Sequence, residues 1–180
     1  MGLINVFTGP MKSGKTSKLI AIYEDLKDTT NKKCMMFKPT IDSRFAENEV
    51  VSRTGDKVFS INIQNIYDLL PYKDLVDIFF IDEFQFLEGQ DISMIINNFI
   101  DNGKKFYIAG LNLTSERKPF GSIPQLLALA EEVEYLEAKC DNCGGNAIYT
   151  YCKDHKKEDI LIGDDNYLSL CHKCYKEMMK

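Results

Sequence analysis

The sequence predicts an α/β protein in which a doubly wound parallel sheet is followed by a small cysteine-bearing C-terminal unit. Three observations lead to this prediction. Short apolar runs alternate with amphipathic segments, the pattern of strands and helices in a parallel sheet. A glycine-rich stretch, TGPMKSGKT, follows the first apolar run closely, and two Cys-x-x-Cys pairs lie near the C-terminus. Because the character of the chain changes after residue 139, we expect two domains, 1–139 and 140–180.

Four apolar runs are the expected strands. LINVF (Leu3–Phe7) is followed closely by Gly-Pro, and CMMFKP (Cys34–Pro39) stops at its proline. VDIFFIDE (Val76–Glu83) is almost continuously apolar, which is typical of a central strand buried on both faces. KFYIAG (Lys105–Gly110) is the fourth run. In such a sheet, ligands bind at the carboxyl ends of the strands.

Two segments have the apolar spacing of helices. The first runs from Thr16 to about Lys27 and the second from Asp91 to Asn102, where Gly103 ends it. The polar stretch from Thr40 to Lys57 is expected to be a long loop.

Composition limits the possible function classes. The chain has 180 residues, 44% of them hydrophobic, so it can build a core. Its net charge of −5 argues against a general nucleic-acid binder. No apolar run approaches the roughly 18 residues of a membrane span, and the N-terminus lacks the features of a signal peptide. We therefore expect a cytoplasmic protein with no membrane or nucleic-acid partner.

The glycine-rich stretch matches the phosphate-binding loop G-x-x-x-x-G-K-T between a strand and a helix. Its backbone N–H groups would cradle phosphates, Lys15 would reach the outer phosphates, and the Thr16 hydroxyl would ligate Mg²⁺. The sheet is thus expected to be phosphate-loop NTPase-like, with ATP and Mg²⁺ as ligands. The loop residues assigned to this site are Gly9, Pro10, Met11, Lys12, Ser13, Gly14, Lys15 and Thr16.

Two adjacent acids close the third apolar run. We expect the strand that ends at Asp82 to lie next to the phosphate loop, where its carboxylate would hold Mg²⁺, directly or through water. Glu83 would point the other way, toward a bound acceptor. It could take a proton from an acceptor hydroxyl or activate water, and the motif alone does not separate a kinase from a hydrolase.

The cysteine pairs have the spacing of zinc knuckles. Four thiolates in two Cys-x-x-Cys turns can complete a tetrahedral site, which leaves no open position and favours a structural Zn²⁺. The predicted ligands are Cys140, Cys143, Cys171 and Cys174, whereas His172 is expected to be a spacer. The tract Gly110–Gly121 follows a strand and could be a lid or an ordinary surface loop.

Together, GPMKSGKT, KPTIDSRF, IDEFQF, GLNLTSERKPFG and the two cysteine pairs resemble the type II thymidine kinases, over about residues 4–174. The resemblance implies transfer of phosphate from ATP to the 5′-hydroxyl of thymidine, with Mg²⁺ and a structural Zn²⁺ in a zinc-ribbon domain. It makes Glu83 the general base and places Asp42 and Arg44 near Mg²⁺ and phosphate. It also implies a homotetramer and feedback inhibition by thymidine triphosphate.

The resemblance further implies a nucleoside pocket. A lasso loop tethered by the zinc ribbon, expected around Ile160–Leu168, would close over the base. The residues implied to contact the nucleoside are Met11, Gln85, Phe86, Leu111, Thr150, Gly163 and Tyr167. The chain departs from the family at Ser115, where Phe is usual, and at Arg53, where His is usual, and its lasso is one residue shorter.

Three alternatives stay open from the sequence. One is a kinase for another deoxynucleoside, which the Ser115 departure and the shortened lasso allow. Another is a nucleotide-gated binding module whose zinc ribbon binds nucleic acid, although acidic residues outnumber basic residues between Cys140 and Cys174. The third is a plain ATPase.

Overall fold

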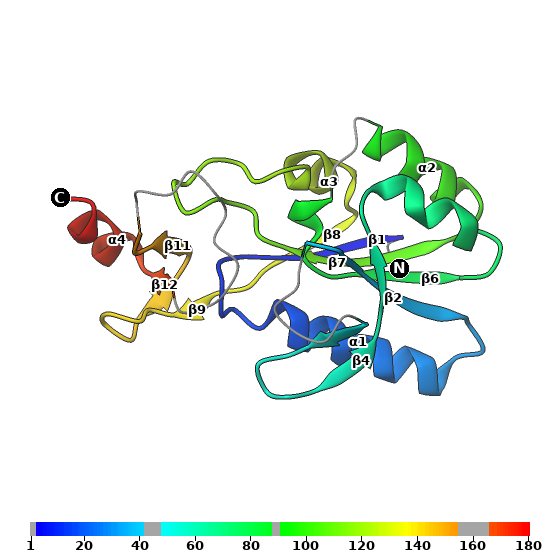
Figure 1. The fold of residues 1–180 in the computed structure, drawn as a ribbon, viewed down its shortest axis with the longest axis horizontal. Helices are drawn as coiled ribbons and strands as arrows, with labels where there is room; N and C mark the ends of the chain where they lie inside the picture. Colours follow the sequence, from blue (N-terminus) through cyan, green and yellow to red (C-terminus); the bar gives the residue numbers. More distant parts are fainter. Residues whose placement is uncertain (1–2, 42–47, 88–90, 155–165) are drawn as a thin grey trace.

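The computed structural model describes residues 3–41, 48–87, 91–154 and 166–180 (Figure 1). Its centre is a six-stranded sheet in the order β5-β2-β6-β7-β1-β8, and every neighbouring pair is parallel. In chain order these strands are β1 (Ile4–Thr8), β2 (Cys34–Pro39), β5 (Ile61–Ile63), β6 (Ile78–Ile81), β7 (Lys105–Gly110) and β8 (Glu132–Tyr135). The predicted parallel α/β sheet is thereby confirmed.

Helices cover both faces of this sheet, as expected of a doubly wound fold. Figure 1 shows α1 on one side and α2 with α3 on the other. The predicted second helix is confirmed within one residue at each end, and the first extends slightly further than expected. The helical elements of this part are α1 (Lys15–Thr29), α2 (Ile92–Asp101), α3 (Ile123–Leu129) and the 3₁₀ turns η1 (Ile66–Tyr72) and η2 (Phe84–Phe86).

The strand order determines which residues surround the phosphate loop. Strand β7 lies between the phosphate-loop strand β1 and β6, the strand that ends before Asp82. Parallel strands nevertheless bring their carboxyl ends to one edge, so the residues after β1, β6 and β7 still meet. That shared edge is where a doubly wound sheet binds its ligands.

Aromatic rings fill the core on the side of α2. Phe79 is fully buried and its ring lies 5.7 Å from that of Phe37, 5.2 Å from that of Phe106 and 5.1 Å from that of Phe99. These contacts link β2, β6, β7 and α2, so this ring is a central element of packing.

Replacing this ring (Phe79→Ala) is expected to lower the free energy of unfolding by about 3–5 kcal/mol, since the cavity cannot collapse among three neighbouring rings. Urea unfolding followed by circular dichroism measures the loss. Phe59→Ala is the matched control, because Phe59 is 67% exposed. Equal effects of the two substitutions would contradict the central role of Phe79.

The expected long loop from Thr40 to Lys57 is wrong over its second half. Residues 49–59 form an antiparallel hairpin of β3 (Glu49–Val51) and β4 (Lys57–Phe59). Val50 and Val58, which pair across it, are buried in the cluster on the α1 side of the sheet. Two apolar pairs, Val50–Val51 and Val58–Phe59, flank a polar turn that contains Gly55 with φ 95°, and this short pattern is the signal that composition alone misses.

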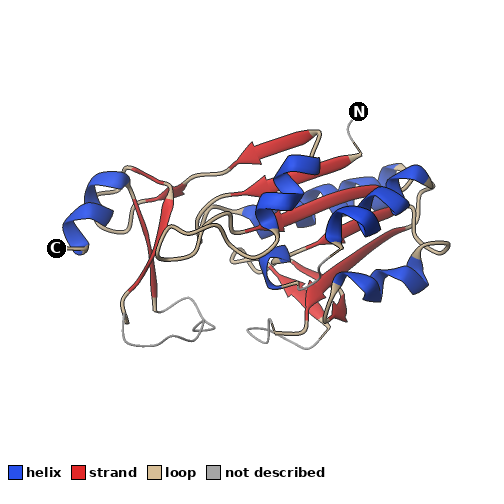
Figure 2. Ribbon diagram, turned by 90° about the horizontal axis from the view of Figure 1, so that it is seen from above, coloured by secondary structure: helices blue, strands red, loops and turns tan. Residues whose placement is uncertain are grey.

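The cysteine-bearing part consists of short elements at one end of the molecule. It contains two antiparallel pairs, β9 (Ala138–Lys139) with β10 (Asn146–Ala147) and β11 (Tyr149–Cys152) with β12 (Tyr167–Leu170), followed by α4 (His172–Met178). Figure 2 shows that this part lies beyond the carboxyl ends of the sheet strands. It has its own cluster of buried side chains, which begins at Ala138 in β9. The division into 1–139 and 140–180 stays a prediction.

No helix within the described ranges has the length and apolar character needed to cross a membrane.

Candidate active site

The phosphate loop connects β1 to α1 at the shared carboxyl edge. Gly9 has φ 145°, and a Cβ atom there would lie 2.1 Å from the carbonyl oxygen of Leu136. Gly14, with φ 83°, turns the chain into α1. Both positions therefore require glycine, and they aim the positive end of the α1 dipole at the space above the loop.

Lys15 is folded into this loop. Its side chain is 7% exposed, and Nζ donates hydrogen bonds to the carbonyl oxygens of Pro10 at 2.6 Å and Gly9 at 3.2 Å. Nζ also lies 3.1 Å from Ser13 Oγ. The ammonium group is thus held within the loop, where it could contact a bound phosphate.

Thr16 and Asp82 meet across two elements. The Thr16 hydroxyl donates a hydrogen bond of 2.9 Å to Asp82 Oδ2, and Asp82 is 5% exposed. A hydroxyl and a carboxylate oxygen side by side are the hard oxygen donors that Mg²⁺ prefers. The donor set therefore fits a magnesium ion at the base of the phosphate loop.

Glu83 follows Asp82 in an unusual backbone conformation. Its φ of 50° lies in the left-handed region, which non-glycine residues rarely adopt. The Gln85 side chain donates a hydrogen bond to Glu83 Oε2, and its own Oε1 accepts one of 2.9 Å from the Leu111 N–H. Since Gln85 is 3% exposed, it is a fixed bridge between the Glu83 carboxylate and the end of β7.

A single cavity of about 270 Å³ joins these groups. The sequence-predicted residues that line it are Met11, Lys12, Ser13, Gly14, Lys15, Thr16, Asp82, Glu83 and Leu111. The β3–β4 hairpin contributes four residues to this cavity that were not predicted as site residues, Val50, Val51, Arg53 and Thr54. Of these, Arg53 stood out in the sequence as a departure from the family.

Other predicted site residues lie around this cavity. Gln85 reaches it through Glu83 and Leu111, and Phe86 packs edge-on against Phe120 with 5.5 Å between ring centroids. Thr150 contacts the phosphate loop, where its hydroxyl oxygen accepts a hydrogen bond of 3.0 Å from the Met11 N–H.

Tyr167 begins β12 and is partly buried. Asp42, Arg44 and Gly163 lie outside the described residues, as does most of the segment 160–168.

The Gly110–Gly121 tract packs against the cysteine-bearing part. The Tyr175 hydroxyl donates a hydrogen bond of 2.6 Å to the Ser115 carbonyl oxygen. The Arg117 guanidinium lies 4.9 Å from the ring centroid of Tyr175 and 5.5 Å from that of Tyr149. This loop is therefore fastened to α4 and β11, and its role as a lid stays a prediction.

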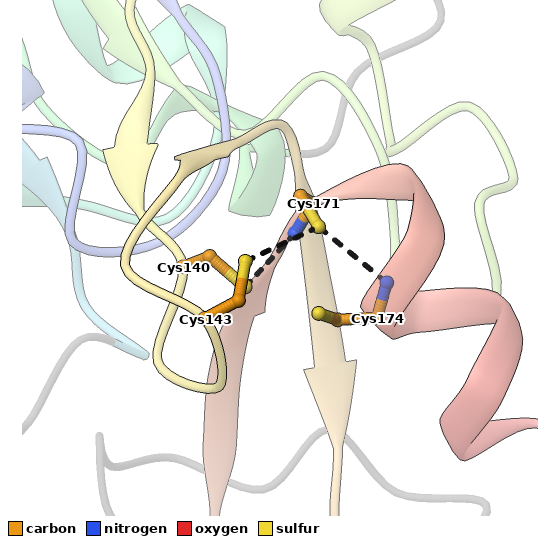
Figure 3. Close-up of side chains that lie close together, drawn as sticks. All are labelled: Cys140, Cys143, Cys171 and Cys174. Carbon is orange, nitrogen blue, oxygen red and sulfur yellow. Dashed lines mark hydrogen bonds between the residues drawn. The ribbon is translucent and has the colours of Figure 1, made fainter.

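The four predicted zinc ligands form one cluster (Figure 3). Their sulfur atoms all lie within 4.8 Å of one another, and Cys143 and Cys171 are separated by 3.8 Å between sulfurs. A tetrahedral Zn²⁺ with Zn–S bonds of about 2.3 Å requires sulfur separations of roughly 3.8 Å. The cluster fits a structural zinc ion, whereas His172 lies 3.5 Å from the Tyr149 hydroxyl through its Nδ1.

The surroundings of the cluster shift the pKa values of two of its thiols in opposite directions. Burial raises the pKa of the Cys140 thiol, but hydrogen bonds with the backbone of Cys171, Cys143 and Asn142 outweigh it and lower the pKa to about 6. The Asn142 amide lowers the pKa of Cys174, but the neighbouring thiols and burial raise it to about 12. Four thiolates so close together repel one another, so a divalent ion is needed to stabilise them all.

Comparison with known proteins agrees with this geometry. Residues 2–175 match the family model described as "Thymidine kinase". The chain is 36% identical over 178 residues to the thymidine kinase of Mycoplasma mobile, covering 98% of this chain and 88% of that protein. It is 38% identical over 183 residues to the thymidine kinase of Mesomycoplasma hyopneumoniae strain 7448, covering 97% and 95%.

Proposed function

Because the chain belongs to the thymidine kinase family, and is thus an enzyme that phosphorylates thymidine in nucleoside salvage, we propose that ATP is its phosphate donor and Glu83 its general base. The observation that supports this most directly is the cavity in which the phosphate loop, Asp82 and Glu83 all meet. A triphosphate donor and a hydroxyl acceptor can be bound side by side there.

The donor half of the site is the phosphate loop. Its backbone N–H groups and the buried Lys15 would hold the phosphates, while Thr16 and Asp82 would hold Mg²⁺. Bound there, the ion would neutralise charge on the β- and γ-phosphates. Asp42 and Arg44 complete this half in our proposal.

The acceptor half is arranged around Glu83. Its carboxylate, oriented by Gln85, would take the proton of the 5′-hydroxyl as the oxygen attacks the γ-phosphorus. The bond from that phosphorus to the bridging oxygen would break, and ADP would leave. Because Glu83 and Asp82 are neighbours with different backbone conformations, one carboxylate can serve the metal and the other the hydroxyl. The nucleoside residues in this proposal are Met11, Gln85, Phe86, Leu111, Thr150, Gly163 and Tyr167.

Further parts of the proposal follow from the family. They are a structural Zn²⁺ on the four cysteines, action in the cytoplasm, a homotetramer, and inhibition by thymidine triphosphate. Of these, the cysteine cluster has direct geometric support.

A nucleoside panel tests the proposed reaction. With Mg²⁺ and ATP, thymidine and deoxyuridine are expected to be phosphorylated, and deoxycytidine, deoxyguanosine and uridine at least about 100-fold less efficiently, because mismatched hydrogen-bonding groups on the base are left unpaired. Chromatography of the nucleoside monophosphates measures each rate. Faster phosphorylation of another nucleoside would indicate a kinase specific for that nucleoside. ATP hydrolysis without any acceptor would indicate a plain ATPase.

A further inference from the structure

The tip of the phosphate loop is bound by the cysteine-bearing part of the chain. The Met11 N–H donates a hydrogen bond of 3.0 Å to Thr150 Oγ1, and the Met11 carbonyl oxygen accepts one of 2.7 Å from Ser169 Oγ. Thr150 and Ser169 face each other as a cross-strand pair of β11 and β12. One strand pair therefore satisfies both backbone groups of Met11.

These contacts are shielded from water. Thr150 is 5% exposed and Ser169 is fully buried. Because the site is buried, water cannot easily replace either hydroxyl. Loss of a hydroxyl would therefore leave a buried N–H or carbonyl group of Met11 without a partner, which is unfavourable. The orientation of the Met11 peptide groups is thus set by side chains that follow them by well over a hundred residues in the chain.

The next residue, Lys12, is held by an ion pair. Its φ of 62° is left-handed, a conformation that non-glycine residues rarely adopt. Lys12 Nζ lies 2.7 Å from Asp141 Oδ2, and the same oxygen accepts a hydrogen bond of 2.7 Å from the Ser169 N–H. Asp141 also donates its own N–H to the Ser169 carbonyl oxygen at 2.8 Å.

Asp141 lies within the first cysteine pair, between Cys140 and Cys143. The same short turn thus supplies two sulfurs of the cluster and the carboxylate that holds Lys12. A change in the fold of this turn would be transmitted to the phosphate loop through two contacts, the ion pair and the β12 hydrogen bonds.

We propose that Ser169 and Asp141 are positioning residues that hold the tip of the phosphate loop, Met11 and Lys12, in the conformation that binds the triphosphate. A loop fixed before the ligand arrives loses less conformational freedom on binding, so the contacts raise nucleotide affinity without touching the nucleotide. This inference rests on the proposed function, because it requires the loop to bind ATP.

The test measures nucleotide binding directly, without a nucleoside. A fluorescent ATP analogue with Mg²⁺ is titrated into the full chain and into Ser169→Ala and Asp141→Asn, the second of which keeps the shape of the side chain. Each variant is expected to bind about five- to tenfold more weakly. In a separate assay with thymidine, kcat at saturating ATP is expected to stay close to that of the parent protein. Glu134→Gln is the matched control, since it removes an exposed carboxylate that pairs with Lys18 of α1, away from the loop tip.

Zinc content and the urea midpoint are measured on the same samples. Weaker binding with both of these unchanged supports the positioning role. Binding within twofold of the parent in both variants would overturn it, and so would a loss of affinity that only follows loss of zinc or of stability. If the parent protein does not bind the analogue at all, the ATP-dependent function itself fails, which separates the two proposals.

Discussion

The substitution Glu83→Gln is expected to lower kcat for thymidine phosphorylation by about 10³-fold, while the Kd of MgATP changes less than about twofold. A positioned general base contributes roughly 10²- to 10⁴-fold to a rate, and an amide of the same shape cannot accept the proton. The Glu83 carboxylate lines the cavity. In the proposed reaction Lys15 and Thr16 hold the phosphate donor, so ATP binding is expected to persist.

Single-turnover measurement of thymidine monophosphate at saturating ATP and thymidine separates this chemical step from product release. Glu49→Gln is a suitable control, because Glu49 is a carboxylate of the neighbouring β3–β4 hairpin that pairs with Lys57. Turnover of the Glu83 variant within about threefold of the parent would remove Glu83 from the role of base. A parallel loss of ATP binding would indicate a role in holding the donor instead.

The second large effect is expected from Cys171→Ser. The native protein should contain about one zinc ion per chain, and this variant should contain close to none, since a hydroxyl is a poor ligand in a four-thiolate site. Cys171 also caps α4, because its sulfur accepts a hydrogen bond of 3.4 Å from the Cys174 N–H. Loss of the ion should therefore unfold the segment from Cys140 onward and inactivate the enzyme.

Metal analysis and limited proteolysis measure the two parts of this prediction. Cleavage sites in the variant should concentrate between residues 140 and 180. Cys34→Ser makes the same chemical change in β2, outside the cluster, and should leave zinc content and protease resistance unchanged. A native protein without zinc, or a zinc-free variant with full activity, would contradict the structural role of the cluster.

Short sequence patterns were sufficient to predict several local elements of this chain. The phosphate loop, strand β2 and helix α2 follow from glycine placement, apolar runs and helical spacing within about a dozen residues. The cysteine pairs predicted a cluster because each Cys-x-x-Cys turn already brings two sulfurs together, and only one site can satisfy four. The same local logic placed Asp82 and Glu83 at a strand end.

Two further features, one with too weak a local signal and one whose partners are distant in the chain, became visible only in the folded structure. The hairpin at residues 49–59 is made of strands of three residues, too short for a periodic signal to stand out from a polar loop. The insertion of β7 between β1 and β6 depends on how whole strands pack, which no stretch of sequence records.

The contacts of Met11 show most clearly why such long-range interactions cannot be predicted from local sequence. Its N–H and carbonyl groups are satisfied by two hydroxyls from a strand pair near the other end of the chain, 139 residues away in the case of Thr150. The residues next to a serine or threonine in a short strand do not show which group its hydroxyl will bind, because folding determines which groups come within hydrogen-bonding distance. The sequence thus determined which chemical groups the site contains, and the tertiary structure decided which of them are held fixed and by what.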